Sequence, residues 1–213
     1  MNRSLSTVLA LLFISGCGAA AGEEYGPDRA SVIFDDNCGA CHGADGHGND
    51  TFQAPAIAGL PTWYVEAQLH KFRTGVRGAH AEDLDGLRMR PMARALVDED
   101  VGHVSAYVAR LAPKQGVHAD LGGDAERGKS LYVTCTACHG TNGMGNETLN
   151  APPIVRLESW YAEAQLYKFK NDIRGANPKD ITGMQMAPMA KTLTDDQAVK
   201  DVLAYIATLP NNP

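Results

Sequence analysis

The pentapeptide CGACH at residues 38–42 is the stretch around which the chain is organised, and it occurs a second time as CTACH at residues 135–139. In each copy a histidine directly follows the second of two cysteines that lie three positions apart. Cys-x-x-Cys-His is the attachment signature of c-type haem, because each thiol can add to a vinyl group and the adjacent imidazole can then bind the iron. We therefore predict two covalently attached haem c groups. Their predicted binding residues are Cys38, Cys41, His42, Cys135, Cys138 and His139, with the two histidines as iron ligands.

Other interpretations of Cys-x-x-Cys have less support. A thioredoxin-like redox pair does not need the following histidine and belongs to a βαβ unit, for which this chain has no Val/Ile-rich strand pattern. A structural zinc site needs four ligands, and a Cys-Cys-His triple lacks a fourth at zinc-finger spacing. Disulfides within the motifs would close very short loops and stabilise the fold little. Haem attachment remains the prediction for both motifs.

The two halves of the chain agree well beyond the motifs. Cys38 and Cys135 are separated by 135 − 38 = 97 positions, and the same offset aligns a glycine-rich loop, an aromatic segment, an Arg-Gly turn and a Met-x-Pro-Met segment. Agreement over so many elements indicates a duplicated domain. We predict a first domain at 27–113, a polar, Gly-rich linker at 114–123 and a second domain at 124–213.

Helical periodicity predicts an all-α fold. Each copy has three helical stretches: one before the cysteines, one over the segment WYxEAQLxKF, and a last one at 98–111 or 194–209 with apolar residues three and four positions apart. Asp98 and Thr194 are the predicted N-caps of the last helices, and the rest is predicted to be loop. A domain of this size has a marginal core, so a covalently held haem would supply much of the apolar surface that the helices cover.

Methionine is the predicted sixth iron ligand in each copy. The Met-x-Pro-Met segment comes before the last helix, where a thioether can reach the distal face of a haem. Met89 and Met186 are the predicted ligands, and Met92 and Met189 are interpreted as packing residues, although either methionine of a copy has the required chemistry. Sulfur favours the reduced iron and raises its potential relative to nitrogen-only ligation. Bis-histidine ligation is the alternative, but none of the remaining histidines recurs in both copies.

Arg77 and Arg174 follow the aromatic segments in Gly-containing turns. A guanidinium group can bind a haem propionate with two parallel hydrogen bonds, so we count both arginines among the predicted cofactor-binding residues. Solvated loop arginines are the alternative. The aromatic residues predicted to pack against the haem or across the domain interface are Trp63, Tyr64, Trp160 and Tyr161.

The first residues predict export from the cytoplasm. Arg3 precedes the apolar run TVLALLFI, which is shorter than the roughly 20 residues of a membrane span but fits a secretory signal. The run leads into Ile-Ser-Gly-Cys17, which resembles the lipobox of bacterial lipoproteins. We therefore predict a lipoprotein signal peptide at 1–16, a lipid on Cys17 and a tether at 17–26, with a plain signal peptide cleaved nearby as the alternative.

Composition narrows the set of partners. The chain is 44% apolar and 21% charged, as expected of soluble globular domains, and its formal net charge is −6. This mild acidity argues against a nucleic-acid surface. It is compatible with a redox protein partner of basic character.

Taken together, these motifs resemble those of dihaem class I cytochromes c of the cytochrome c4 type. The resemblance rests on CxxCH with its glycine-rich loop, the W/Y-x-x-x-Q-L helix, the Arg-Gly turn, and Met-x-Pro-Met-Ala before a last helix. It implies two all-α cytochrome c domains related by a pseudo-twofold axis, with His/Met ligands at both irons. It also implies electron carriage in the periplasm, where proteins of this family often feed terminal oxidases or serve dehydrogenases. The chain departs from the family in its lipobox, so we expect a lipid-anchored carrier of single electrons between a respiratory donor and a terminal oxidase or reductase.

Two alternatives to a free carrier stay open. One is an electron-transfer subunit of a dehydrogenase complex, and the other is a dihaem peroxidase or thiosulfate-oxidising enzyme. Six-coordinate iron offers no open position for substrate chemistry, so the prediction is an electron-transfer protein without catalytic residues.

Overall fold

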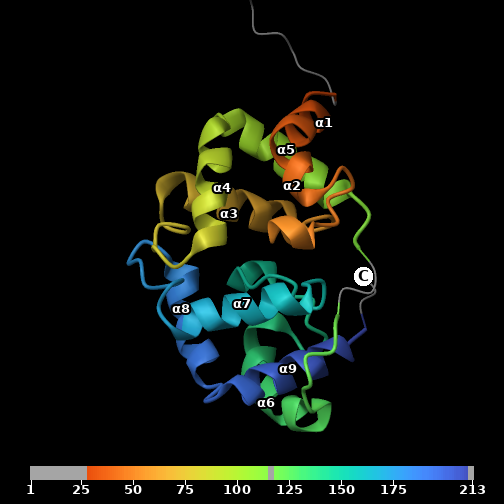
Figure 1. Cartoon of the computed structure of the whole chain (residues 1–213), viewed down its shortest axis with the longest axis vertical. Coiled ribbons are helices and arrows are strands. Elements are labelled where there is room, and N and C mark those ends of the chain that lie inside the picture. Colours follow the sequence, from red (N-terminus) through yellow and green to blue (C-terminus); the bar gives the residue numbers. More distant parts are fainter. Residues whose placement is uncertain (1–27, 115–117, 211–213) are drawn as a thin grey trace, which may run out of the picture.

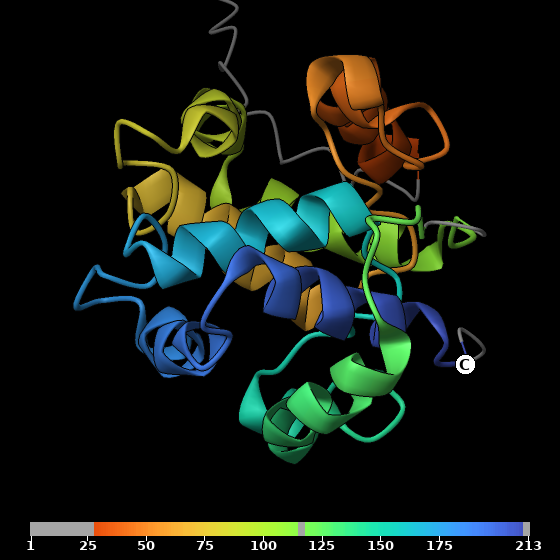
Figure 2. The same cartoon turned by 60° about the horizontal axis from the view of Figure 1, so that its bottom comes forward.

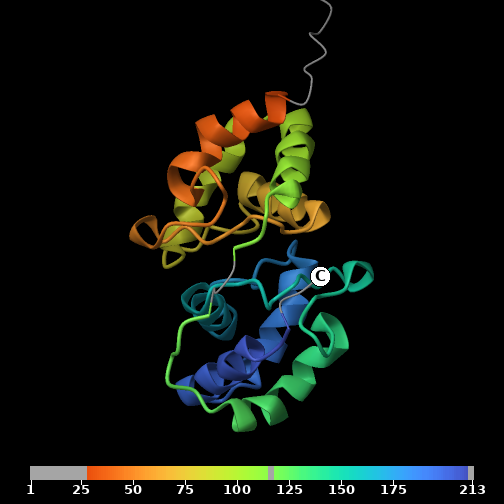
Figure 3. The same cartoon turned by 90° about the vertical axis from the view of Figure 1, so that its right-hand side faces the viewer.

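The chain forms two helical halves that lie one above the other in Figure 1 and in the side view of Figure 3. The computed structural model describes residues 28–114 and 118–210. In the first half the helices are α1 (Asp28–Phe34), α2 (Ala40–His42), α3 (Thr62–Thr74), α4 (Leu84–Ala95) and α5 (Asp98–Arg110). In the second half they are α6 (Ala125–His139), α7 (Ser159–Lys170), α8 (Ile181–Lys191) and α9 (Asp196–Ala207).

The remaining described residues form turns and loops. Short 3-10 turns at Asp50–Phe52 and Glu147–Leu149 follow the two glycine-rich loops. Over the described ranges the chain contains isolated bridges but no β-strand, which confirms the predicted all-α class. None of the helices in these ranges has the length and apolar character that crossing a membrane requires.

The segment that carries the methionines is a helix in each half, which corrects the prediction of a loop there. Pro91 and Pro188 lie inside α4 and α8, and proline normally disfavours a helix interior. Each helix begins at a strong cap, because the side chains of Asp83 and Asp180 accept hydrogen bonds from the N–H groups of Gly86 and Gly183. The stabilisation from the capped first turn and from the buried alanines of these helices outweighs the loss of one backbone N–H donor at the proline.

The last helix of each half lies close to its predicted position, but the predicted caps are wrong. Val97 precedes α5, and Asp98 lies in its first turn, where a carboxylate interacts favourably with the helix dipole. In the second half the cap is Asp195 rather than Thr194, because the Asp195 side chain accepts from the N–H of Ala198 at 2.7 Å.

The helix that leads into the first motif is interrupted, whereas its counterpart is continuous. A π-helical turn at Asp35–Gly39 separates α1 from α2, while α6 runs unbroken to its end. Equivalent aromatic pairs fix the register: Phe34 packs on Tyr107 at 5.2 Å between ring centroids, and Tyr132 packs on Tyr205 at 5.3 Å. Phe34 lies four positions before Cys38, whereas Tyr132 lies three positions before Cys135. The π turn thus accommodates one extra residue.

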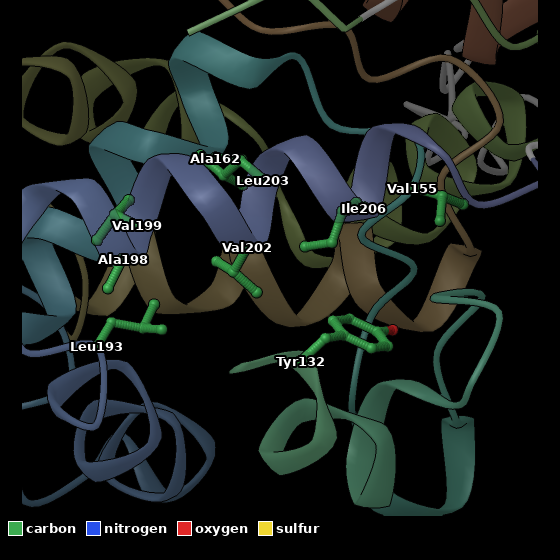
Figure 4. Packing of buried hydrophobic residues seen from close by; sticks show 9 residues of the cluster. All are labelled: Tyr132, Val155, Ala162, Leu193, Ala198, Val199, Val202, Leu203 and Ile206. Atoms are coloured by element: carbon green, nitrogen blue, oxygen red, sulfur yellow. The ribbon is translucent and has the colours of Figure 1, made fainter. Parts of the chain in front are cut away.

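Each half has its own apolar core. In the first half α1 packs against α5, around Phe34, Val101, Val104 and Val108. In the second half α6 crosses α9, as Figure 2 shows, and Figure 4 shows how the buried side chains meet there. The labelled cluster is Tyr132, Val155, Ala162, Leu193, Ala198, Val199, Val202, Leu203 and Ile206. Separate cores are expected of two domains that fold around similar elements.

Candidate haem-binding sites

An apolar cavity lies beside the first Cys-x-x-Cys-His motif. Its lining includes Cys38, Cys41 and His42 of the motif and the methionines of α4, Met89 and Met92. Apolar side chains from α3 and α5 complete much of the lining. The structure thus brings together the thiols, the imidazole and the thioethers that the sequence predicts for the first site.

The two motif histidines have the same hydrogen bond. Nδ1 of His42 lies 2.8 Å from the carbonyl oxygen of Pro55, and Nδ1 of His139 lies 2.8 Å from that of Pro152. A carbonyl oxygen can only accept, so Nδ1 carries the proton and Nε2 keeps a lone pair for a metal. Burial lowers the pKa of both histidines, against the opposing effect of these carbonyl groups. Both imidazoles are therefore held neutral in the tautomer that an iron ligand requires.

The glycine-rich loops hold the prolines against the histidines. Gly48 has φ +81° and Gly145 has φ +82°, and their N–H groups donate to the carbonyl oxygens of His42 and His139 at 2.7 and 2.9 Å. A Cβ atom on Gly48 would lie 2.6 Å from the backbone nitrogen of Ala56. Only glycine fits both the positive φ and this close approach. The glycine pattern of the sequence is thus explained by the loop behind each imidazole.

None of the four motif thiols is paired with another cysteine in a disulfide. Burial and then the neighbouring cysteine raise the pKa of Cys38 to about 11 and that of Cys135 to about 11, while Cys41 and Cys138 are exposed. The disulfide alternative is therefore not what the structure contains. Among the described residues no group of three or more His, Cys, Asp or Glu side chains converges on a possible metal position.

The methionines of each half lie one helical turn apart. Met89 and Met186 are half-buried, and Met186 packs on Phe169 in a small cluster with two alanines. Met92 is 38% exposed and Met189 is 39% exposed. Because residues three positions apart share a helix face, both methionines of α4 reach the same cavity.

The predicted propionate-binding arginines lie at the boundary between the halves. Arg77 donates to Gln68 at 2.9 Å, and across the boundary to Tyr161 at 2.9 Å and Gln165 at 3.0 Å. Arg174 makes the mirrored contacts, to Gln165 at 2.9 Å and to Gln68 at 3.1 Å. The solvated-loop alternative is therefore wrong for Arg77, which is buried, and Tyr161 does pack across the interface as predicted.

Each arginine also keeps one buried donor unused. The Nε atoms of Arg77 and Arg174 have no hydrogen-bond partner in the protein, and each guanidinium stacks on a phenylalanine ring, Phe72 at 4.6 Å or Phe169 at 4.5 Å. Buried donors are normally satisfied, so these two point to an acceptor that the protein itself does not supply.

Two ion pairs across the boundary escape sequence reasoning. Lys71 pairs with Asp180 at 2.6 Å, and Lys168 pairs with Asp83 at 2.6 Å. Both lysines and both aspartates are related by the repeat offset, and this recurrence was the signal that could have found them. Burial lowers the pKa of Lys71 against the opposing effect of Asp180, so burial outweighs pairing for that lysine. The halves are thus joined by a polar, reciprocally matched interface.

The residues present fit a c-type haem. In the first site the donor set consists of two thiols, one neutral imidazole and two thioethers in the lining of an apolar cavity, which also contains an unused arginine donor. These are the groups that would bond the vinyl carbons, ligate the iron, cover the ring and meet a propionate. The predicted signal peptide at 1–16, Cys17 and the tether at 17–26 lie outside the described residues.

Comparison with known proteins gives consistent matches. The cytochrome c family model matches residues 27–112 and again 125–210. A thiosulfate dehydrogenase electron acceptor of Stutzerimonas stutzeri (strain A1501) is 31% identical, over 96% of this chain and 94% of its own length. Cytochrome c4 of Azotobacter vinelandii is 30% identical over 96% of each chain. Among solved structures, thiosulfate dehydrogenase (TsdBA) from Marichromatium purpuratum superposes with a TM-score of 0.69 at 28% identity, over 87% of this chain and only 40% of that one.

Proposed function

Since this chain belongs to the cytochrome c family, as a dihaem electron-transfer protein of the cytochrome c4 type, we propose that it carries single electrons in the periplasm between a respiratory donor and a terminal oxidase or reductase. It has two covalently bound haem c groups, and each supplies a reversible one-electron change of iron oxidation state when bound. The observation that carries the proposal is the repeated pairing of a Cys-x-x-Cys-His motif with a buried imidazole whose Nδ1 donates to a proline carbonyl, which leaves the lone pair on Nε2.

We assign the attachment and proximal ligation to the two motifs. The cysteines would form the thioether bonds, and Nε2 of each motif histidine would bind iron because Nδ1 donates to a carbonyl. The assigned residues are Cys38, Cys41 and His42 in the first site and Cys135, Cys138 and His139 in the second.

We assign the sixth ligands to Met89 and Met186. Both are less exposed than the methionine one turn later, and Met89 lines the cavity that also contains His42. A thioether in this position leaves no open site for an outside ligand and favours the reduced metal. Both effects suit a carrier rather than an enzyme.

We assign Arg77 and Arg174 to the haem propionates. Their Nη atoms are used by the interface, so the unused Nε donors are the atoms that would meet a carboxylate. Each arginine would then connect a cofactor with the opposite domain.

We place the protein in the periplasm, held to a membrane surface by a lipid on Cys17. The charged start, the apolar run and the small residues before Cys17 support export and lipidation. Mass spectrometry of the mature N-terminus tests this: a diacylated Cys17 is expected, and a mature chain that starts after it would contradict the anchor.

A second candidate is a specific one: the electron acceptor of a thiosulfate dehydrogenase. The names of the Stutzerimonas stutzeri relative and of the Marichromatium purpuratum structure favour it. Stopped-flow mixing of the oxidised protein with a purified thiosulfate dehydrogenase and thiosulfate distinguishes the two candidate functions. Fast reduction at both haems would favour thiosulfate dehydrogenase as the donor. Reduction only by a respiratory complex in membranes would favour the carrier with a respiratory donor.

The general proposal is tested on the matured protein. A pyridine haemochrome assay should give two haem c groups per chain, and the reduced protein should show no spectral response to carbon monoxide. Rapid carbon monoxide binding at either site would contradict six-coordinate iron and reopen the enzyme alternative.

A further inference from the structure

One peptide group connects the first site with a carboxylate of the second domain. The carbonyl oxygen of Pro55 accepts the hydrogen bond of His42 Nδ1 at 2.8 Å. The N–H of the same peptide belongs to Ala56, and it donates to Oε2 of Glu158 at 2.8 Å. The imidazole, the amide and the carboxylate therefore form one continuous hydrogen-bonded chain.

Glu158 is held firmly in this position. The residue is 3% exposed, and Nζ of Lys114 donates to its Oε1 at 2.7 Å. Two residues earlier, Arg156 donates to the carbonyl oxygen of Gly59 at 3.0 Å. This corner of the second domain is thus fixed against the loop that lies behind His42.

The second site has no counterpart to this chain. His139 bonds the carbonyl of Pro152 in the same way, but the next residue is Pro153, which has no N–H to donate. At the position equivalent to Glu158, the first domain has Pro61, which has no carboxylate. The second imidazole therefore lacks both the amide donor and the carboxylate acceptor of this hydrogen-bonded chain, which we call the relay.

The chemical effect of the relay follows from the amide group. Its C–N bond has partial double-bond character, so donation from the N–H to a carboxylate increases negative charge on the carbonyl oxygen. A more negative oxygen pulls harder on the Nδ1 proton and makes the imidazole a stronger electron donor to a bound metal. Stronger donation stabilises the oxidised metal relative to the reduced one.

We propose that Glu158 is a positioning residue for the first site, which acts through the Pro55–Ala56 peptide to make His42 electron-rich and thereby lowers the reduction potential of the first haem. The second haem receives no such contribution. The proposal rests on the assignment of His42 as an iron ligand, so it deepens the proposed function.

Three variants test it in the matured two-haem protein. Glu158→Gln removes the charge and keeps an acceptor. Ala56→Pro removes the donor and keeps the charge, and the sequence already has proline at the equivalent position, Pro153. Pro153→Ala is the matched control, since it gives the second site an N–H with no carboxylate to receive it.

Spectroelectrochemical titration gives both potentials, and NMR signals of the two ligand rings assign them to domains. We expect Glu158→Gln and Ala56→Pro each to raise the reduction potential of the first haem. The redox equilibrium of that haem should change tenfold or less, which corresponds to a shift of at most about 59 mV for one electron. In the double variant the two shifts should be much smaller than additive. Pro153→Ala should leave both potentials unchanged.

Two results would overturn the proposal. One is a shift in Glu158→Gln that Ala56→Pro does not reproduce, because a simple long-range charge effect does not need the amide. The other is a shift of equal size at both haems. The unmodified protein provides a check independent of folding: the Nδ1 proton of His42 should resonate further downfield than that of His139, and equal shifts would contradict the relay. A haemochrome count of two in every variant keeps the proposed function intact whichever result is obtained.

Discussion

Lys168 and Asp83 form an ion pair between the two domains, with 2.6 Å between Nζ and Oδ1. The lysine side chain is 9% exposed and that of the aspartate 3%. The repeat supplies the same pair in the opposite direction, from Lys71 to Asp180. Removal of one partner of such a buried pair destabilises the protein, because the other charge is left desolvated and unpaired.

Replacement of Lys168 by methionine should therefore destabilise the protein by about 3–5 kcal/mol, as the loss of one partner of a buried pair does. Urea unfolding followed by circular dichroism measures the change. A double-mutant cycle with Asp83→Asn should give a coupling energy of about 0.5–3 kcal/mol.

Lys191→Met is the matched control, because Lys191 pairs with Asp172 on the exposed surface. Such surface pairs contribute about 1 kcal/mol or less. Equal losses in Lys168→Met and Lys191→Met would mean that the interface pair has no special role.

The same pair predicts a dependence of stability on pH. Burial acts to raise the pKa of Asp83, but the hydrogen bond and charge of Lys168 outweigh it, and the pKa lies below its usual value. A carboxyl group with a lowered pKa in the folded state stabilises the protein above its unfolded pKa of about 3.9. This contribution is lost as the pH falls through the folded value.

We therefore expect the difference in unfolding free energy between the unmodified protein and Asp83→Asn to be constant from pH 5 to 7 and to shrink at about pH 4 and below. Thermal unfolding at a series of pH values measures it. A difference that persists unchanged to the lowest pH at which the protein folds would show that Asp83 is not ionised in the folded state.

The choice between the two methionines of each half is open to a direct test. Met89→Leu should abolish the sulfur-to-iron absorption band at the red end of the visible spectrum for one haem, because leucine keeps the volume and removes the sulfur. Met92→Leu should retain that band. Absorption spectra of the oxidised proteins decide, and the pair Met186→Leu and Met189→Leu tests the second site. Loss of the band in Met92→Leu alone would transfer the assignment to Met92.

The loop behind the first imidazole predicts a position that is intolerant of any side chain. Gly48→Ala should destabilise the first domain by about 1–3 kcal/mol through overpacking, since the added Cβ would lie 2.6 Å from the backbone nitrogen of Ala56. The yield of haem at the first motif should fall with it.

Gly122→Ala is the control for backbone strain alone. Its φ is +74°, close to that of Gly48, but a Cβ atom there would have nothing within 4 Å. Differential scanning calorimetry compares the two variants. If both lower the melting temperature equally, the close packing behind His42 has no separate effect.

Much of the fold can be read from local patterns. The spacing of apolar residues predicts α3, α7 and the last helix of each half, and the shared offset predicts two similar domains. The helices with internal prolines are missed, because a propensity argument weighs Pro91 more heavily than the cap that Asp83 provides. The extra residue before Cys38 is also missed, since the spacing of apolar residues does not reveal a π turn.

Apart from Tyr161, the residues that meet between the domains were not identified from such patterns. Arg77 is assigned to a cofactor from its turn alone, yet its Nη atoms contact Tyr161 and Gln165 in the other half. Which residues meet at an interface depends on how two folded bodies dock, and a single sequence does not contain that relationship in its local spacing. Glu158 illustrates this most clearly, because its partner Ala56 is an alanine with no side-chain chemistry to attract notice.

The contact between Glu158 and the loop of the opposite domain means that the two repeats are no longer interchangeable building blocks. A tandem of two first repeats would have proline at the position of Glu158, because the corresponding residue is Pro61. The amide of Ala56 would then meet the junction without an acceptor. Duplication has thus been followed by specialisation, and the first repeat now depends on a neighbour that differs from itself.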